Sequence, residues 1–343
     1  MPAEDLTIRG SAPAGAFPRP VLRPLVALGV VAVLLAVIGF ASLKEGAISL
    51  TFRETWTGLT STSDPLARNV VWQIRYPRLL DAMVVGAGLA VAGALLQGVT
   101  RNPLADPTIL GVTAASGLAS AALIVRDPQA PQWAIAAACA FGGLAGAAIL
   151  YVIAWRGAVS PLRLTLAGVA LSAFFGAIIV GLLASSRTFL QTSLGFLAGG
   201  LYGSEWRDLW AALPWAAAGL LGAVLLAGRL NILALGDDVA AGLGLLTDRT
   251  RLLVLACVGL LTAAAVSIAG LVSFVGLVCP HIARATVGSD NRLVIPFSAL
   301  YGALLVVAAD LGARLIIRPA ELPMGIITAF IGAPFLLYLV RFR

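Results

Sequence analysis

The sequence predicts an all-α, polytopic membrane protein with ten transmembrane helices. Of its 343 residues, 60% are hydrophobic and only 11% are charged, and the mean hydropathy is +0.98. This small polar fraction could not cover the surface of a soluble particle of that size. The strict alternation of apolar and polar residues that marks transmembrane β-strands is absent, so the apolar runs predict helices. The 37 glycines suit helices that pack closely in lipid.

Charge-free runs mark the expected spans. Eight of them are 24–43, 82–100, 107–125, 128–155, 164–186, 209–228, 293–309 and 322–340. The longest run, 252–283, would measure about 48 Å as one helix, whereas the hydrocarbon core of a bilayer is roughly 30 Å thick. This run therefore contains two spans or one broken span. We expect two, with a turn at Ala269 and Gly270 and the second span ending at the cytosolic face in the segment from Pro280 to Arg284.

The basic residues set the orientation. The net charge is +7, and Lys44 is the single lysine. With ten spans and the amino terminus inside, slightly more of the 23 basic residues lie in the cytosol than outside, whereas nine spans reverse that bias. The expected layout is a cytosolic tail, 1–23, and one transmembrane domain, 24–343. Because the arginines lie in loops between spans, they reflect topology and anionic lipid, and no nucleic-acid partner is expected.

Two cytosolic connections have recognisable local signals. In 101–107, Asp106 is expected to cap the third helix, with Pro107 in its first turn. In 229–251, Asp237 or Asp238 can cap a short turn that Gly242 and Gly244 end, which predicts two small helices at the membrane face. Such short helices are marginal alone, so they are held either by the bundle or by a cytosolic partner protein.

The outer side carries a second group of candidates. Residues 192–203 are apolar but too short for a span, and they predict a half-helix at the outer mouth. Arg78 and Asp81 are spaced to pair at i, i+3, and Asp310 and Arg314 at i, i+4. These charges either neutralise one another or, together with Arg75, present arginines to an acidic partner.

The chain lacks the groups that catalysis would need. His281 is the single histidine and is expected at a helix end, while Cys139, Cys257 and Cys279 lie in apolar runs as buried hydrophobes. No convergent metal ligands or activated nucleophile can be assembled from these residues. Lys44 is not part of a phosphate-binding GxxxxGK[ST] loop. No catalytic residue, metal or bound cofactor is therefore expected.

Five ordered motifs carry a family resemblance. They are RNPLADPTILG (101–111), LNILALGDDVAAGLG (230–244), GLVSFVGLVCPHIAR (270–284), AADLGAR (308–314) and ELPMGIITAFIGAPFLLYL (321–339). In order and spacing they resemble the permease subunits of type II ABC importers for ferric siderophores, haem and cobalamin. The resemblance runs from about Trp72 to the carboxyl terminus.

The resemblance implies an assembly in the cytoplasmic membrane. It implies a dimer of this chain, or of this chain with a homologous permease, around a central pathway. Two cytosolic ATPase subunits would bind ATP and Mg, and a periplasmic or lipid-anchored substrate-binding protein would dock outside. The chain itself would not be an enzyme. A proton-driven secondary transporter fits less well, because it would need acids near the midplane of the bilayer.

The resemblance also assigns candidate sites. The loop between the sixth and seventh helices would contact the ATPase through Asp237, Asp238, Gly242, Leu243 and Gly244. Arg75, Arg78 and Arg314 match the outer arginines that meet acidic residues of the binding protein. Phe196 stands where many relatives have tryptophan, so the resemblance does not identify the residues that line the outer mouth. Among the substrates of the family, a ferric siderophore is favoured over haem and cobalamin.

Overall fold

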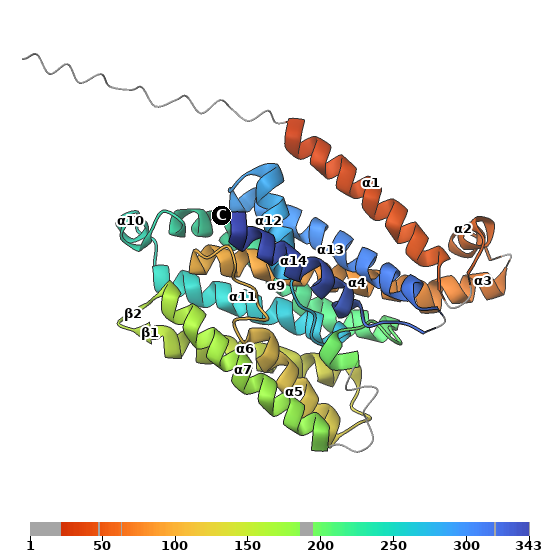
Figure 1. The fold of residues 1–343 in the computed structure, drawn as a ribbon, viewed down its shortest axis with the longest axis horizontal. Coiled ribbons are helices and arrows are strands. Elements are labelled where there is room, and N and C mark those ends of the chain that lie inside the picture. Colours follow the sequence, from red (N-terminus) through yellow and green to blue (C-terminus); the bar gives the residue numbers. More distant parts are fainter. Residues whose placement is uncertain (1–21, 47–48, 63, 186–194, 319, 343) are drawn as a thin grey trace, which may run out of the picture.

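Among the described residues, ten apolar helices form the bundle, and Figure 1 shows their arrangement. The computed structural model describes residues 22–342 except 47–48, 63, 186–194 and 319. The ten helices are α1 (Leu22–Lys44), α4 (Tyr76–Thr100), α5 (Val112–Arg126), α6 (Gln132–Ala154), α7 (Pro161–Ser185), α9 (Trp206–Leu233), α11 (Thr247–Ala269), α12 (Val275–Val287), α13 (Asn291–Ile316) and α14 (Met324–Phe342). Seven are long enough and apolar enough to cross a membrane, and α5, α12 and α14 are shorter. They agree with the ten predicted spans.

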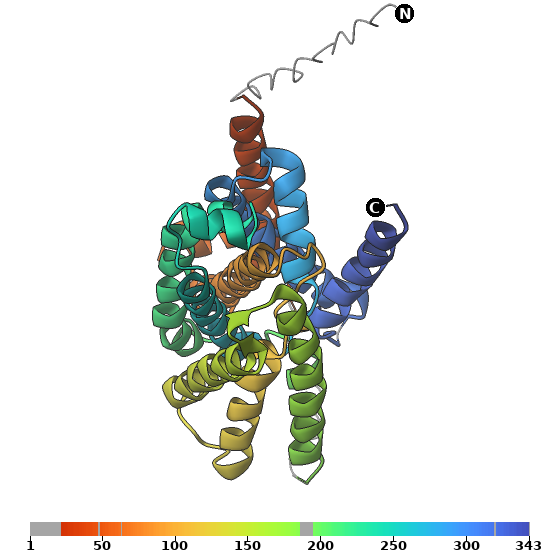
Figure 2. The same cartoon turned by 90° about the vertical axis from the view of Figure 1, so that its left-hand side faces the viewer.

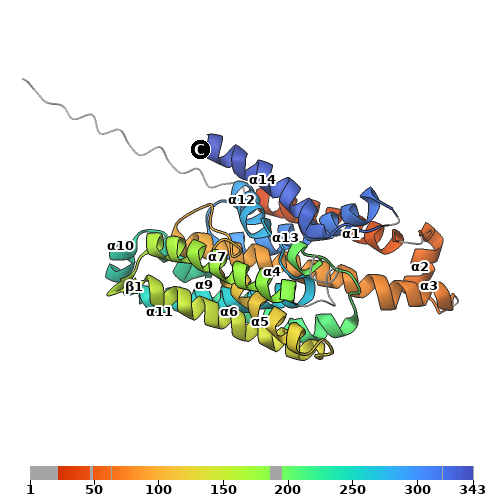
Figure 3. The ribbon, with the colours of Figure 1, turned by 60° about the horizontal axis from the view of Figure 1, so that its bottom comes forward.

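Short elements gather at two opposite ends of the bundle (Figures 1 and 3). At one end lie α10 (Asp237–Gly242) and a pair of antiparallel two-residue strands, β1 (Trp155–Arg156) and β2 (Ala158–Val159), which joins α6 to α7. At the other lie α2 (Phe52–Thr60), α3 (Pro65–Asn69) and the π-helical segment η1 (Val70–Arg75), which runs into α4. By the predicted orientation, the α10 end is the inner, cytosolic end and the α2 end is the outer end.

The longest apolar run is broken where the sequence predicts. Helix α11 ends at Ala269, and Gly270 takes φ 69°, a conformation that L side chains rarely adopt. A Cβ on Gly270 would lie 2.4 Å from the carbonyl oxygen of Phe196, so the turn requires glycine for space as well. The prediction of two spans with a turn at Ala269 and Gly270 is therefore confirmed.

The second span continues further than predicted. Helix α12 runs to Val287, so His281 lies inside it, and the prediction of a helix-end histidine is wrong. The His281 ring contacts Phe335 of α14 edge-on, with centroids 5.4 Å apart. Pro280 removes one N–H from the helical ladder, which frees the carbonyl oxygen of Gly276. The side-chain amide of Gln97 on α4 donates to that oxygen at 3.2 Å, so the helix passes through Pro280 without a buried unsatisfied carbonyl there.

Two predicted local features differ from the structure. Helix α5 begins at Val112, after Gly111 in a left-handed conformation, and Asp106 instead caps the preceding turn by accepting from the Thr108 backbone N–H at 2.8 Å. Between 229 and 251 only one short helix, α10, is described, because α9 extends to Leu233 and α11 begins at Thr247. The two flanking helices therefore take up most of the expected second helix.

Helix α4, orange in Figure 2, lies in the middle of the bundle. It packs against α9, α11, α12 and α13. Glycines allow the closest approaches: a Cβ on Gly86 would lie 2.1 Å from the Gly302 carbonyl oxygen of α13, and one on Gly93 would lie 1.9 Å from that of Gly276 on α12. Backbones meet directly at these points, as small residues permit in membrane helices.

We predict that Gly93→Ala lowers the free energy of unfolding by about 1–3 kcal/mol, because the added methyl group must displace the backbone of α12. The measurement is the unfolding transition of the purified protein in detergent. Gly29→Ala is the matched control, because Gly29 lies in α1 with nothing within 4 Å of the new Cβ. Equal stability of the two variants would contradict the close packing of α4 on α12.

Candidate functional site: charged clusters at the two ends of the bundle

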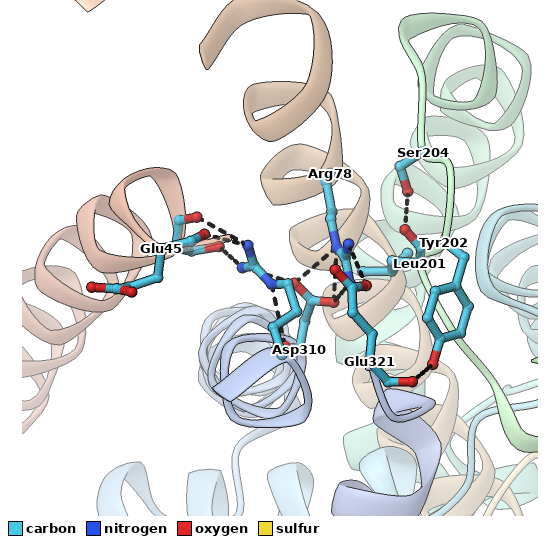
Figure 4. A network of polar contacts seen from close by, with 9 residues as sticks. Glu45, Arg78, Leu201, Tyr202, Ser204, Asp310 and Glu321 are labelled. Carbon is cyan, nitrogen blue, oxygen red and sulfur yellow. Dashed lines mark hydrogen bonds and ion pairs between the residues drawn. The ribbon is translucent and has the colours of Figure 1, made fainter. Parts of the chain in front are cut away.

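The outer cluster is built around one buried carboxylate. Asp310 of α13 accepts from Arg78, the third residue of α4, at 3.1 Å from Nε and 2.9 Å from Nη2 (Figure 4). Arg314, one turn further along α13, pairs with the other oxygen of Asp310 at 3.0 Å. Arg78 also reaches Glu321 at 2.9 Å, in the connection to α14. The cluster therefore ties α4, α13 and the start of α14 together.

The two other predicted outer arginines point inward. Arg75 and Arg314 are each 5% exposed, and both donate to the backbone around the end of α1. The accepting carbonyl oxygens are those of Leu43 and Lys44 for Arg75, and those of Ser42 and Glu45 for Arg314. Carbonyl groups at a helix carboxyl end lack partners within the helix and favour a positive charge. In this conformation the two arginines hold the outer end of α1.

The local charge pairs predicted from spacing have different outcomes. The Asp310–Arg314 pair is confirmed by the 3.0 Å contact. The Arg78–Asp81 pair is wrong, because Arg78 turns to Asp310 and Glu321 while Asp81 is fully buried near Asp208 of α9. Thus the charges of Arg78 and Arg314 are balanced by those of Asp310 and Glu321. The role of Arg75, Arg78 and Arg314 in docking stays a prediction.

A cleft of about 1000 Å³ lies beside the outer cluster. Its polar lining includes Gln132, Tyr202, Ser204, Arg207, Asp208 and Glu321, and Phe196 contributes an apolar wall. Tyr202 donates to the Glu321 carbonyl oxygen at 2.8 Å, which joins the segment before α9 to the segment before α14 (Figure 4). Of the predicted half-helix, residues 192–194 lie outside the described part, and residues 195–198 are helical.

The inner cluster also centres on one carboxylate. Oδ1 of Asp237, the first residue of α10, accepts from Arg101 at 3.0 Å and from Arg251 of α11 at 2.7 Å. Arg251 is 1% exposed and also donates to the Val159 carbonyl oxygen at 2.9 Å. Thus Asp237 is not a helix cap, because Gly236 occupies that position. These contacts attach α10 to the bundle. They support the first of the two predicted alternatives, in which the bundle itself holds the short helix in place.

The other coupling candidates lie at the surface of the inner end. Leu243 is 61% exposed, and Val239 and Leu246 are also exposed. Gly244 takes φ 80°, and a Cβ on Gly242 would meet nothing within 4 Å. Asp238 is in the first turn of α10, where an acidic residue stabilises the helix amino end. The apolar side chains are left uncovered in a region outside the expected bilayer.

The sequence did not identify the residues whose side chains fix Asp237 and the central helices in place. Arg101 and Arg251 were counted only as topological charges, although both bind Asp237. Gln97 was part of an apolar run, yet it bonds Gly276, Ala105 and Arg284. A polar residue within a span could have signalled Gln97, because such groups are costly in lipid unless paired. Nothing in local spacing connects Arg101 to Asp237, which is 136 positions away.

Within the described residues, no group of three or more His, Cys, Asp or Glu side chains could hold a metal ion. Cys139, Cys257 and Cys279 are free and buried, as predicted. In the described part of the chain, ten apolar helices with charged clusters at the two ends of the bundle define a multi-pass membrane protein.

The comparisons with known proteins give the particular family. A model of the FecCD transport family matches residues 34–342, and the chain belongs to this family. A probable siderophore transport system permease protein of Bacillus subtilis (strain 168), YfiZ, is 41% identical over 307 residues, which are 88% of this chain and 91% of that protein. An Fe(3+)-citrate import system permease protein of the same organism, YfmD, is 38% identical over 313 residues, covering 91% and 93%.

A solved structure agrees with this assignment. A metal-chelate type ABC transporter in an inward-facing conformation is 32% identical, with a TM-score of 0.81, and the match covers 93% of this chain and 99% of that one. The chain is thus an importer permease of the ABC class and a multi-pass protein of the cytoplasmic membrane.

We predict that Asp310→Asn destabilises the protein by about 3–5 kcal/mol, because it leaves the buried guanidinium groups of Arg78 and Arg314 without their shared carboxylate. Thermal or denaturant unfolding in detergent measures the loss. Arg318→Gln is the control: it breaks an exposed pair with Glu45, whose N–O distance is 2.5 Å, and such pairs contribute about 0–1 kcal/mol. If both variants lose the same small amount, Asp310 does not organise the outer cluster.

Proposed function

We propose that this chain is the permease subunit that carries a ferric siderophore from outside the cell to the cytosol. The match over residues 34–342, together with relatives named for siderophore, Fe(3+)-citrate and iron(3+)-hydroxamate import, supports this substrate class. Relatives named for cobalamin and hemin transport make those ligands the alternative. Two copies, or one copy and a homologous permease, form the pathway. ATP and Mg bind to a partner ATPase dimer, which drives transport.

The inner end is the proposed ATPase contact. Asp237, Asp238, Gly242, Leu243 and Gly244 lie in or just after α10. The exposed side chains of Val239, Leu243 and Leu246 support this assignment, because apolar groups at a cytosolic surface favour burial against a partner. Gly242 and Gly244 leave the backbone open to close approach there.

The outer end is the proposed docking region for the substrate-binding protein. Arg78 is the member that an acidic partner residue could reach, because its side chain is 13% exposed and is held by Glu321, whose side chain is 26% exposed. Arg75 and Arg314 would act beneath it by holding the segment 42–45 in place. Charges arranged in this way orient docking more than they add affinity.

The substrate assignment predicts a specific uptake pattern. The permease is co-expressed with its ATPase, purified, placed in lipid vesicles and supplied with its binding protein. Radiolabelled ferric hydroxamate, ferric citrate, hemin and cobalamin are then offered in turn. We expect ATP-dependent accumulation of a ferric chelate and at least ten-fold less of hemin and cobalamin. Preferential uptake of hemin or cobalamin would show that this ligand, and not a ferric siderophore, is the substrate. The absence of ATP-dependent uptake would refute the proposal that the chain is part of an importer.

The docking assignment predicts a salt-dependent effect. We expect Arg78→Gln to weaken the affinity of the binding protein for the vesicle-embedded permease and to reduce the dependence of that affinity on salt, since one screened charge contact is lost. Arg318→Gln, at the exposed pair with Glu45, should leave both quantities closer to those of the wild type. An unchanged affinity at low salt in a folded Arg78→Gln variant would count against docking at Arg78.

A further inference from the structure

The connection after α4 contains an unusual backbone conformation. In the described part of the chain, Arg101 and Phe274 are the non-glycine residues with positive φ. Arg101 ends α4 with φ 50° and ψ 32°, a left-handed conformation that is unfavourable for a side chain with a Cβ. Such conformations persist only where surrounding contacts hold them, and they gather at sites where mechanism requires a fixed geometry.

The contact that holds Arg101 leads to α10. Its guanidinium group donates to Oδ1 of Asp237 at 3.0 Å, and the same oxygen accepts from Arg251 of α11 at 2.7 Å. Arg251 is 1% exposed and is anchored to the β1–β2 connection through the Val159 carbonyl oxygen. One carboxylate oxygen thus links three segments: the end of α4, the short helix α10 and the start of α11.

Asp237 contacts the bundle through Oδ1, and its side chain is 38% exposed. Its Oδ1 is occupied by the two arginines, whereas Val239 and Leu243 are 51% and 61% exposed. The apolar surface available to a partner is therefore formed by residues other than the two arginines that hold Asp237. Because α10 has only six residues, it is not stable alone, and its position depends on this attachment.

We propose that Arg101 and Arg251 are positioning residues that couple α10 to α4 through Asp237, so that a displacement of α10 is passed to the central helix. This inference rests on the proposed function, because it concerns how the ATPase contact acts on the bundle. Arg101 passes the displacement of α10 to α4, which is 25 residues long and meets α12 and α13 at glycine contacts. Arg251 sets the orientation of the Asp237 carboxylate from a buried, fixed position.

The test separates binding of the ATPase to the permease from coupling of ATP hydrolysis to transport. Arg101→Gly keeps the left-handed backbone, which glycine adopts freely, and removes only the side chain. Arg251→Gln removes the charge of the second arginine on the same carboxylate oxygen. The control is Arg249→Gln, which removes an exposed arginine from the same turn of α11. Each variant is co-purified with its ATPase, and substrate transported per ATP hydrolysed is measured in vesicles with the radiolabelled ferric chelate that the wild type accumulates.

We expect Arg101→Gly and Arg251→Gln to retain the ATPase and its hydrolysis while transport per ATP falls at least ten-fold, with the double variant no worse than either single variant. Arg249→Gln should match the wild type. Transport per ATP equal to wild type in both variants would overturn the inference while leaving the proposed function intact. Loss of the ATPase from either variant would also overturn it, because the contact would then only shape the docking surface. A wild-type complex without ATP-driven uptake would refute the proposed function and this inference with it.

Discussion

The structure depends on direct backbone contact between α4 and its neighbours. Gly86 meets Gly302 of α13, and Gly93 meets Gly276 of α12, at distances that leave no room for a side chain. Between helices that share the same apolar solvent, packing and hydrogen bonding replace the hydrophobic effect as the cause of association. Because α4 is fixed at these points, its two ends are fixed as well, and the residues that matter most lie there: Arg78 at the outer end and Arg101 at the inner end.

At each end two arginines share one carboxylate, although the outer cluster is more deeply buried than the inner one. At the outer end Asp310 is shared by Arg78 and Arg314, and at the inner end Asp237 is shared by Arg101 and Arg251. A guanidinium group held away from water needs a compensating charge and several acceptors, which a carboxylate and backbone carbonyl oxygens supply together. In each cluster the carboxylate joins helices that are distant in sequence. The clusters therefore fix the relative position of the helix ends and do not merely balance charge.

The sequence predicted features that depend on local chemistry. Charge-free runs gave the spans, and the length of 252–283 required a turn that Gly270 provides. Predictions failed where a distant element supplied the partner: the i, i+3 rule paired Arg78 with Asp81, but Asp310, 232 positions away, takes its place. Likewise, Pro280 suggested a helix end near His281, but Gln97 of α4 satisfies the carbonyl that the proline frees, so α12 continues. Single-sequence spacing carries no information on these contacts.

The distribution of close contacts determines which parts of the bundle can move as units. Helix α4 cannot slide on α12 or α13 without breaking backbone contacts at Gly276 and Gly302, so the three helices form one body. Gln97 strengthens this body, since its amide bridges α4 to α12. In contrast, α7 is largely exposed and contacts mainly α5 and α6. On the other side of the bundle, α6 meets α11 at Gly143 and Gly259 and meets α5 at Gly142, where an added Cβ would lie 2.5 Å from a carbonyl oxygen, so α5, α6 and α11 form a second closely packed group. In both groups, glycines lie at the points where helix backbones meet.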